Sequence, residues 1–497
     1  MKRQAYNPYL PSFEYIPDGE PHVFGSRIYL YGSHDRFGGT QFCLNDYVCY
    51  SADVKDLSDW RYEGVIYRKE QDPRNKNLSE QTKPQAIHAM WAPDVVQGPD
   101  GNYYLYYCLD YLPEIAVAVC NSPAGAYEFL GLVRHSDGTA LGARDGDLEQ
   151  FDPGVFIDDD GTIYLYSGNA PMKKEYDYGR QGSQVMRLQP DMVTLAKEPE
   201  KLLPDVLDSA GTGFEGHEFF EASSIRKIHG AYYFVYSSVR SHELCYAVSS
   251  KPDGGCRFGG TLVDIGDVFL NGRTEEEAVN CLGNTHGGIE QADGQWYIFY
   301  HRQTNRTNYS RQGCAEKIDI NEDGSIAQAE VTSCGLQNGP LEGAGTYPAR
   351  ICCHLTAAKG AVFSDPDHMK MDYPYLTQDL PDLEPTSEWI QQDAKEPVQY
   401  IKNMQDGSAA GYKYFDFHNL RRISVQVRGK ADGVIAIGTA KTDGSAGRIP
   451  VRLDTADWQE LYGDVSIKDG IAALYFTFQG EGQLDFRSFC LQRDTEL

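Results

Sequence analysis

The sequence predicts an all-β protein, a five-bladed β-propeller followed by a β-sandwich. One run of aromatic and β-branched residues occurs five times in the first 300 residues, each time after a glycine turn. Such a run is typical of a buried strand that follows a tight turn. A chain of 497 residues also exceeds the roughly 250–300 residues at which one core stops growing. A second alternating pattern begins near residue 400 and predicts a second domain.

The five runs share a central tyrosine, and these tyrosines are separated by 75, 60, 69 and 64 residues. The runs occupy residues 27–31, 102–106, 162–166, 231–235 and 295–299. This period leaves room for a four-stranded antiparallel sheet with long loops, which is the unit of a propeller. Repeated pairs of helices are the alternative, but the alternation of tyrosines argues against them.

One polar residue stands ten to twelve residues before each central tyrosine, on the strand expected to be innermost: Asp18, Asp94, Asp152, Glu221 and His286. A single carboxylate of this kind is readily explained as a solvated turn residue, because carboxylates are mostly exposed. Five at equivalent places predict a ring of polar groups around the axis. Carboxyl groups held together raise one another's pKa, so one can stay protonated as an acid beside an ionised base.

The stretches around these residues resemble glycoside hydrolase family 43. They are Asn-Pro-Tyr-Leu at 7–10, Ile-Pro-Asp at 16–18, Trp-Ala-Pro-Asp at 91–94, Phe-Asp-Pro-Gly-Val-Phe at 151–156, Asp-Asp-Asp-Gly at 158–161, Phe-Glu-Ala-Ser-Ser at 220–224 and Asn-Thr-His-Gly at 284–287. They follow the order of the family over the first 300 or so residues. The resemblance implies a five-bladed propeller that removes terminal sugars or short glycans from plant polysaccharides with inversion at the anomeric carbon.

The resemblance also implies a role for each of three carboxyl groups. Asp18 matches the general base that activates water, Glu221 the general acid, and Asp152 the third carboxylate, which orients the acid and keeps its pKa raised. Inversion needs a base and an acid about 6.5–9.5 Å apart with water between them. Rival residues are Glu20 for the base, and Glu215 and Glu218 for the acid. None of them lies ten to twelve residues before a central tyrosine.

Four further residues are candidates for binding. Trp91 is expected to stack on the terminal sugar, or else to be a core or rim aromatic. Asp94 either contacts substrate or fixes its turn. Arg302 binds a site carboxylate or a sugar hydroxyl, or forms a surface ion pair. The resemblance implies that His286 lies by a calcium ion near the axis, whereas a hydrogen-bonded core histidine is the alternative. No organic cofactor is expected.

The expected domains are a catalytic propeller, a connecting segment and a sandwich, at residues 1–335, 336–385 and 386–497. The last 110 or so residues resemble carbohydrate-binding module family 6. Tyr412, Tyr414 and Trp458 are its candidate glycan-binding aromatics. The alternative is a sandwich that braces the propeller or mediates oligomerisation.

The charge balance limits the partners. With 45 basic and 72 acidic residues, the net charge is −27, which repels nucleic acid and anionic membranes. No apolar run typical of a signal peptide or a membrane span is present, so a cytoplasmic location is expected. The twelve cysteines are scattered and predicted to be reduced.

The sequence therefore predicts an inverting exo-glycosidase acting on plant-derived oligosaccharides from hemicellulose such as arabinoxylan. α-L-Arabinofuranose is the first choice of released sugar, β-D-xylose is close behind, and galactose is third. One alternative is a sugar-binding propeller without catalysis. Another is a retaining fructan-type propeller hydrolase, but residues 16–19 do not match the Asn-Asp-Pro-Asn of that class.

Overall fold

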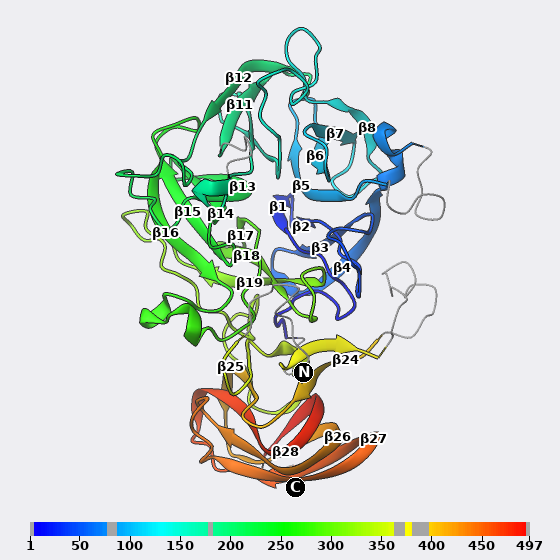
Figure 1. Ribbon diagram of the computed structural model, residues 1–497, viewed down its shortest axis with the longest axis vertical. Coiled ribbons are helices and arrows are strands. Elements are labelled where there is room, and N and C mark those ends of the chain that lie inside the picture. Colours follow the sequence, from blue (N-terminus) through cyan, green and yellow to red (C-terminus); the bar gives the residue numbers. More distant parts are fainter. Residues whose placement is uncertain (1–3, 77–86, 177–181, 362–372, 380–396, 494–497) are drawn as a thin grey trace.

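The computed structural model describes residues 4–76, 87–176, 182–361, 373–379 and 397–493. Within them the protein is all-β, with short 3-10 turns as its helical elements. A ring of sheets forms the upper body in Figure 1, and a curved sheet forms the lower body. No helix in these residues is long and apolar enough to cross a membrane.

The upper body contains five antiparallel sheets in chain order, the first four with four strands each and the last with three. The strands of the first two sheets are β1 (Glu20–Phe24), β2 (Arg27–Tyr31), β3 (Tyr47–Asp53), β4 (Asp56–Tyr67), β5 (Met90–Gln97), β6 (Tyr103–Leu109), β7 (Ile115–Cys120) and β8 (Glu128–Leu132). Those of the other three are β9 (Gly154–Ile157), β10 (Ile163–Ser167), β11 (Gln184–Leu188), β12 (Leu195–Lys201), β13 (Phe219–Ile228), β14 (Ala231–Ser238), β15 (Glu243–Ser249), β16 (Arg257–Asp264), β17 (Ile289–Ala292), β18 (Gln295–Gln303) and β19 (Arg311–Ile318).

Each predicted aromatic run is the second strand of one sheet, so the prediction of a five-bladed propeller is confirmed. The tyrosines and branched residues of these strands fill the spaces between neighbouring blades. A separate buried apolar cluster joins each blade to the next, and one of the five clusters joins the last blade to the first. The first strand of each blade lies innermost, because β1 packs against β5 and β17, and β9 packs against β5 and β13.

The amino-terminal segment closes the ring through Asn7, which is fully buried. Its side-chain amide donates to the carbonyl of Ala315 and to Oε1 of Glu316, both at 2.9 Å, and its Oδ1 accepts from the Ala315 N–H at 3.0 Å. A parallel bridge between Gly19 and Gly287 adds a second link. The start of the first blade is therefore held beside the last blade.

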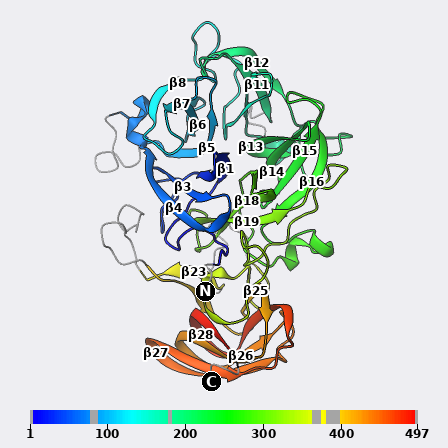
Figure 2. The ribbon, with the colours of Figure 1, turned by 180° about the vertical axis from the view of Figure 1, so that it is seen from behind.

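The lower body is one nine-stranded sheet that curves around a single apolar core (Figures 1 and 2). Its strands are β20 (Leu341–Glu342), β21 (Gly345–Pro348), β22 (His354–Thr356), β23 (Tyr375–Gln378), β24 (Gln399–Met404), β25 (Ala409–Phe417), β26 (Leu420–Gly438), β27 (Gly447–Asp464) and β28 (Gly470–Arg493). The described part of the expected connecting segment 336–385 belongs to this sheet, because β20 to β23 pair with β24, β25 and β28. The sequence pattern did not predict these strands, because they are short and are separated by glycines and prolines.

The two bodies are joined by polar contacts. Lys413 and Tyr414 of β25 bind the two carboxylate oxygens of Glu330 at 2.6 and 2.7 Å. Gln399 donates to Gln312 at 2.9 Å. These contacts support the alternative in which the second domain braces the propeller.

Two of the three candidate glycan-binding aromatics of the second domain, Tyr412 and Tyr414, are engaged in contacts within the protein. Tyr412 is fully buried in the core, so the prediction that it binds a glycan is wrong. Tyr414 is half-buried and its hydroxyl donates to Glu330. The ring of Trp458 lies 4.4 Å from the guanidinium carbon of Arg428. The likeness to carbohydrate-binding module family 6 stays a prediction.

Candidate active site

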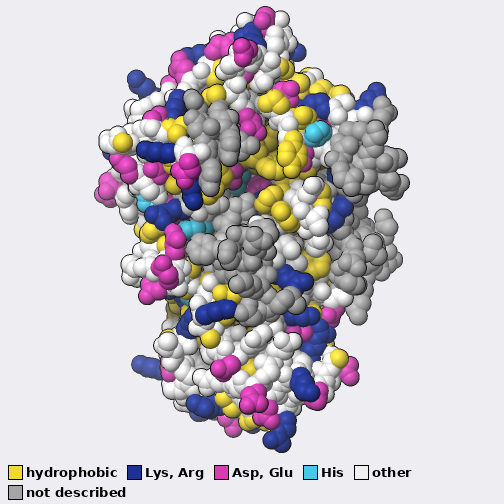
Figure 3. Space-filling view, in the orientation of Figure 1, with side chains coloured by type: hydrophobic (Ala, Val, Ile, Leu, Met, Phe, Trp, Pro, Cys, Tyr) yellow, Lys and Arg dark blue, Asp and Glu magenta, His cyan; other side chains and the backbone are white. Residues whose placement is uncertain are grey.

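A cavity of about 540 Å³ opens in the propeller, which is the size of a small-molecule site. Asp18, Asp152, Glu221 and His286, four of the five predicted axial residues, line it, and so does Trp91. In Figure 3 hydrophobic side chains gather over the middle of the propeller, with acidic side chains among them. The predicted carboxyl groups from the first, third and fourth blades therefore meet in one cavity.

The backbone around these carboxyl groups is strained. Asp18 immediately precedes the first blade and Asp152 the third, and they have φ angles of 57° and 45°. Ala222, directly after Glu221 in β13, has a φ of 71°. Residues with a Cβ rarely adopt this left-handed region, and such strain concentrates at functional sites. The surrounding ring of blades holds each carboxyl group in place against this cost.

Asp18 is buried and faces positive charge. Arg311 donates from Nη1 to its Oδ1 at 3.0 Å, and the backbone N–H of Asp18 donates to Nδ1 of His301 at 3.1 Å. Burial by itself raises the pKa of Asp18, but Arg311 and the two nearby histidines outweigh it and hold the pKa below its usual value. Asp18 is therefore an ionised carboxylate at neutral pH.

Arg311 is itself anchored by a carboxylate behind the cavity. Its Nε and Nη2 donate to the two oxygens of Asp35 at 2.8 and 2.9 Å. This two-point contact fixes the plane of the guanidinium and leaves Nη1 directed at Asp18.

Asp152 is the third carboxylate of the cavity, and its negative charge raises the pKa of Glu221 and of His286. Its Oδ2 is 3.5 Å from Nδ1 of His286, whose other close carboxylate is Asp18 at 4.0 Å. Burial raises the pKa of Asp152, while His286 opposes that rise. For His286 burial lowers the pKa, but Asp152 and Asp18 more than compensate and raise it to about 9.

Glu221 is the carboxyl group that stays protonated. Burial, followed by the negative charge of Asp152, raises its pKa to about 8. Asn169 donates from Nδ2 to its Oε2 at 3.1 Å and fixes the orientation of the group. Sequence reasoning missed Asn169, because an asparagine after a strand gives no signal that its side chain turns toward the next blade.

An aromatic wall faces these groups. Trp91 packs edge-to-face against Phe151 at 5.1 Å between ring centroids and lies 6.0 Å from Phe42, whose ring is 4.7 Å from the guanidinium carbon of Arg311. All three aromatic residues line the cavity. Such a wall suits the apolar face of a sugar ring.

Arg302 does not reach this cavity, so its predicted contact with substrate is wrong. It is buried, and its guanidinium donates to the carbonyl oxygens of Cys352 and Cys353 at the junction with the second domain, both at 3.3 Å. In the β18–β19 hairpin Arg311 pairs with Gln303, one residue after Arg302. Side chains alternate between the faces of a strand, so a shift of one residue exchanges the cavity for the domain junction.

Asp94 does not line the cavity either. Its Oδ1 is 2.6 Å from Nε2 of His22, and its Oδ2 accepts from the backbone N–H of Val155 in the third blade at 2.7 Å. Its role is to tie inner strands together, as the turn-fixing alternative proposed. The prediction that it contacts substrate is contradicted by this position.

The rival carboxyl groups lie elsewhere. Glu20 binds Arg226 and Ser224, each at 2.8 Å, outside the cavity lining. Glu215 is exposed and accepts from the Gly211 N–H, and Glu218 binds the Ser209 hydroxyl at 2.9 Å. The blade offset therefore selected the residues that line the cavity.

Two groups of side chains in the described residues have the composition of a metal site. Glu20, His22 and Asp94 form one near the inner strands, and Oε2 of Glu20 is buried there without a hydrogen-bond partner among the described residues. Carboxylate oxygens are the ligands that Ca²⁺ prefers. This group therefore fits a cation, although Arg226 occupies the other oxygen of Glu20.

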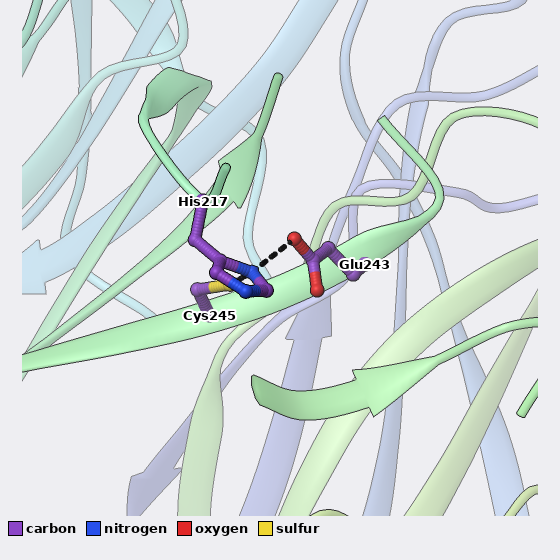
Figure 4. A group of neighbouring side chains, drawn as sticks. All are labelled: His217, Glu243 and Cys245. Carbon is purple, nitrogen blue, oxygen red and sulfur yellow. Dashed lines mark hydrogen bonds and ion pairs between the residues drawn. The ribbon is translucent and has the colours of Figure 1, made fainter. Parts of the chain in front are cut away.

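The second group, shown in Figure 4, contains His217, Glu243 and Cys245. Nδ1 of His217 is 2.8 Å from Oε1 of the fully buried Glu243, which also accepts from Ser238 at 2.6 Å, and Thr261 bonds to its other oxygen at 3.1 Å. Both carboxylate oxygens are thus satisfied by protein donors. The group is a hydrogen-bonded support beneath the β14–β15 loop.

The geometry combines an ionised carboxylate, a protonated carboxyl group and a third carboxylate in one aromatic-lined cavity. This set can protonate a leaving oxygen on one side and activate water on another, which is the chemistry of glycoside hydrolysis by two carboxyl groups.

Comparison with known proteins agrees with this chemistry. The sequence model of glycosyl hydrolases family 43 matches residues 7–326. A xylosidase/arabinosidase of Thermoclostridium stercorarium is 49% identical over 497 residues, 99% of this chain and 100% of that protein. Another, of Bacteroides ovatus, is 30% identical over 59% of this chain and 87% of its own. The solved arabinoxylan arabinofuranohydrolase of Bacillus subtilis in complex with cellotetraose is 21% identical, with a TM-score of 0.49 and coverage of 98% of both chains. The chain belongs to glycosyl hydrolases family 43 and is a glycoside hydrolase.

Proposed function

We propose that this protein is an inverting exo-glycosidase that releases terminal α-L-arabinofuranose or β-D-xylose from hemicellulose oligosaccharides. The observation that carries the proposal is the opposite perturbation of two carboxyl groups that line one cavity. The pKa of Asp18 is lowered and that of Glu221 is raised to about 8. The names of the relatives from Thermoclostridium stercorarium and Bacteroides ovatus, both xylosidase/arabinosidase, support the choice of sugars.

In the proposed mechanism Glu221 is the general acid. Its proton, retained at neutral pH because of burial and Asp152, passes to the glycosidic oxygen as the bond to the anomeric carbon breaks. Asn169 holds the carboxyl group in one orientation through the bond to Oε2. Asp152 acts on the reaction through the pKa of the acid.

Asp18 is the general base in this mechanism. Arg311 keeps it ionised and holds Oδ1, so the carboxylate is oriented to take a proton from water. The water oxygen attacks the anomeric carbon from the side opposite to the leaving oxygen, which inverts the configuration.

The buried floor supports exo action. Asp18, Asp152, His286 and Arg311 are each at most 7% exposed. A terminal sugar unit that enters the cavity can reach these groups at its floor, while the rest of the substrate stays outside.

Hydrolysis of nitrophenyl glycosides tests the proposal and separates the candidate sugars. We expect release of nitrophenol from the α-L-arabinofuranoside, the β-D-xyloside or both, and much slower release from the β-D-galactoside. Failure to cleave any of these, together with failure on arabinoxylan oligosaccharides, would contradict the proposed function.

We also propose that a calcium ion binds near the propeller axis. Glu20 and Asp94, with His22 or the predicted ligand His286, are the residues that would hold it. The buried Oε2 of Glu20, which has no hydrogen-bond partner in the part of the chain that the structure describes, supports this assignment. When bound, the ion supplies positive charge close to the carboxyl groups of the site.

The predicted location in the cytoplasm remains a proposal. It implies that the substrate reaches the enzyme as short oligosaccharides, because polysaccharides do not enter that compartment. Fractionation of the source cells, with activity assayed in each fraction, tests it.

A further inference from the structure

Two loops of different chemistry, here called lips, line the cavity together with Glu221. One lip includes Met172, which is 40% exposed and follows Asn169, the hydrogen-bond partner of Glu221, by three residues. The other is the loop between β14 and β15, where Arg240, Ser241 and His242 line the cavity. This loop belongs to the same blade as Glu221.

Arg240 is held in one position by three neighbours. Its Nε donates to the carbonyl of Gly216 at 2.9 Å, its Nη1 donates to Oε1 of Glu275 at 2.8 Å, and its guanidinium carbon lies 4.9 Å from the ring centroid of Phe269. Beneath it the carboxylate of Glu243 is fixed by His217 and Ser238, and the Ser238 hydroxyl accepts from the Arg240 backbone N–H at 3.1 Å. Among the described residues Nη2 of Arg240 has no partner. One N–H edge of a fixed guanidinium is therefore available at the mouth of the cavity.

Glu275 lies beside that donor but is not among the residues that line the cavity. Its side chain is 36% exposed and that of Arg240 is 32% exposed, so solvent reaches both groups. Nε2 of the buried His242, another lining residue, lies 3.6 Å from Oε1 of Glu275. Glu275 thus supports the lip by offsetting the charge of Arg240 and holding its guanidinium in place.

The proposed mechanism decides which part of the substrate meets this lip. The terminal sugar occupies the buried floor, and the leaving oxygen must lie at Glu221 to receive its proton. The remainder of the substrate then leaves the cavity between Met172 and Arg240. This step depends on the proposed function.

We propose that Nη2 of Arg240 donates a hydrogen bond to a hydroxyl group of the sugar in the leaving group, and that Glu275 positions the guanidinium for this contact. A sugar hydroxyl can accept such a hydrogen bond. Arg240 therefore contributes to the recognition of oligosaccharides over substrates whose leaving group carries no hydroxyl.

The test compares two substrates that share the released sugar and differ in the leaving group. For Arg240→Met we expect kcat/KM on a xylo-oligosaccharide or arabinosyl xylo-oligosaccharide to fall at least about tenfold, the order of a lost charge-assisted hydrogen bond. We expect kcat/KM on the matching nitrophenyl glycoside to change less than about twofold, since that leaving group has no hydroxyls for the lip. Glu275→Gln, which weakens the contact that positions the arginine, should show a smaller loss that is likewise confined to the oligosaccharide.

Arg187→Met is the matched control. Arg187 is 39% exposed and paired with Asp253 at 2.5 Å on the outer part of the third blade, away from the cavity. This substitution should leave kcat/KM unchanged on both substrates. The Tm of each variant shows whether that variant folds.

Equal losses on both substrates, or full activity of both lip variants on the oligosaccharide, would overturn the proposal. A wild-type enzyme that cleaves neither substrate would instead overturn the proposed function on which it rests.

Discussion

Arg311 donates from Nη1 to Oδ1 of Asp18 across 3.0 Å while Asp35 holds the opposite edge of its guanidinium. Asp18 and Arg311 are 293 residues apart in the chain, at the first and last blades of the ring. Closure of the propeller therefore creates the ion pair that keeps the proposed base ionised. The integrity of the ring and the charge state of the site are linked through this one contact.

Glu221→Gln should lower turnover on an oligosaccharide at least about a hundredfold, because proton transfer to the leaving oxygen is lost. A nitrophenyl glycoside should suffer less, since nitrophenolate leaves with little protonation. Steady-state kinetics on both substrates provide the measurement. Glu215→Gln, which removes the charge of a nearby exposed glutamate, is the control and should retain full activity. Equal losses on both substrates would show that Glu221 is not the acid.

Asp18→Asn should lower turnover on every substrate at least about a hundredfold, whatever the leaving group, because water is no longer activated. In the wild-type enzyme the first-formed sugar should have the anomeric configuration opposite to that of the substrate. Proton NMR of the product, recorded before mutarotation, shows which anomer forms first. A retained anomer, or a sugar bound covalently to Asp18, would reverse the assignment of mechanism.

The activity of the enzyme should fall as the pH rises through about 8, because Glu221 must carry its proton to act as the acid. The base Asp18 must be ionised, and its lowered pKa keeps it so down to acid pH. In Asp152→Asn the negative charge that raises the pKa of Glu221 is gone, so the alkaline limb should move to lower pH. Profiles of kcat/KM against pH for both proteins check this. An alkaline limb at the same pH in the variant would show that Asp152 does not raise the pKa of Glu221.

Arg311 and Arg302 should respond differently to the same substitution. Arg311→Gln removes the charge that lowers the pKa of Asp18, so kcat/KM should fall and its acid limb should move to higher pH. Arg302→Gln leaves the Cys352 and Cys353 carbonyls without their cationic donor, so the Tm should fall while the pH profile keeps its shape. A shifted pH profile in the Arg302 variant would return that residue to the active site.

Chelation should lower the Tm or the activity if calcium binds at the axis, because a ligand of the native state stabilises it by linkage. Added Ca²⁺ should restore the loss in the wild-type protein. In Glu20→Gln, which weakens the proposed oxygen ligand, the response to Ca²⁺ should be much smaller. Elemental analysis that finds no metal, with no effect of chelation, would leave His286 as a hydrogen-bonded residue of the cavity.

The sequence by itself determined the architecture of the propeller and identified the three carboxyl groups that line its cavity. Aromatic runs of period two, repeated about every 65 residues, define blades because local alternation and glycine turns are properties of the chain alone. The similar offset of ten to twelve residues before each central tyrosine then separates Asp18 and Glu221 from Glu20 and Glu215.

Tertiary structure alone decided which neighbours surround those carboxyl groups. The choice of Arg311 over Arg302 depends on one step of strand alternation, and the contact of Arg311 with Asp18 depends on ring closure. Asn169 reaches Glu221, and Arg240 reaches the cavity, from loops whose paths follow no periodic pattern. The strands of residues 341–378 also escaped detection, because their partners lie as far as residue 491. Contacts between distant segments arise only when the blades and the second domain have packed, and no local pattern records them.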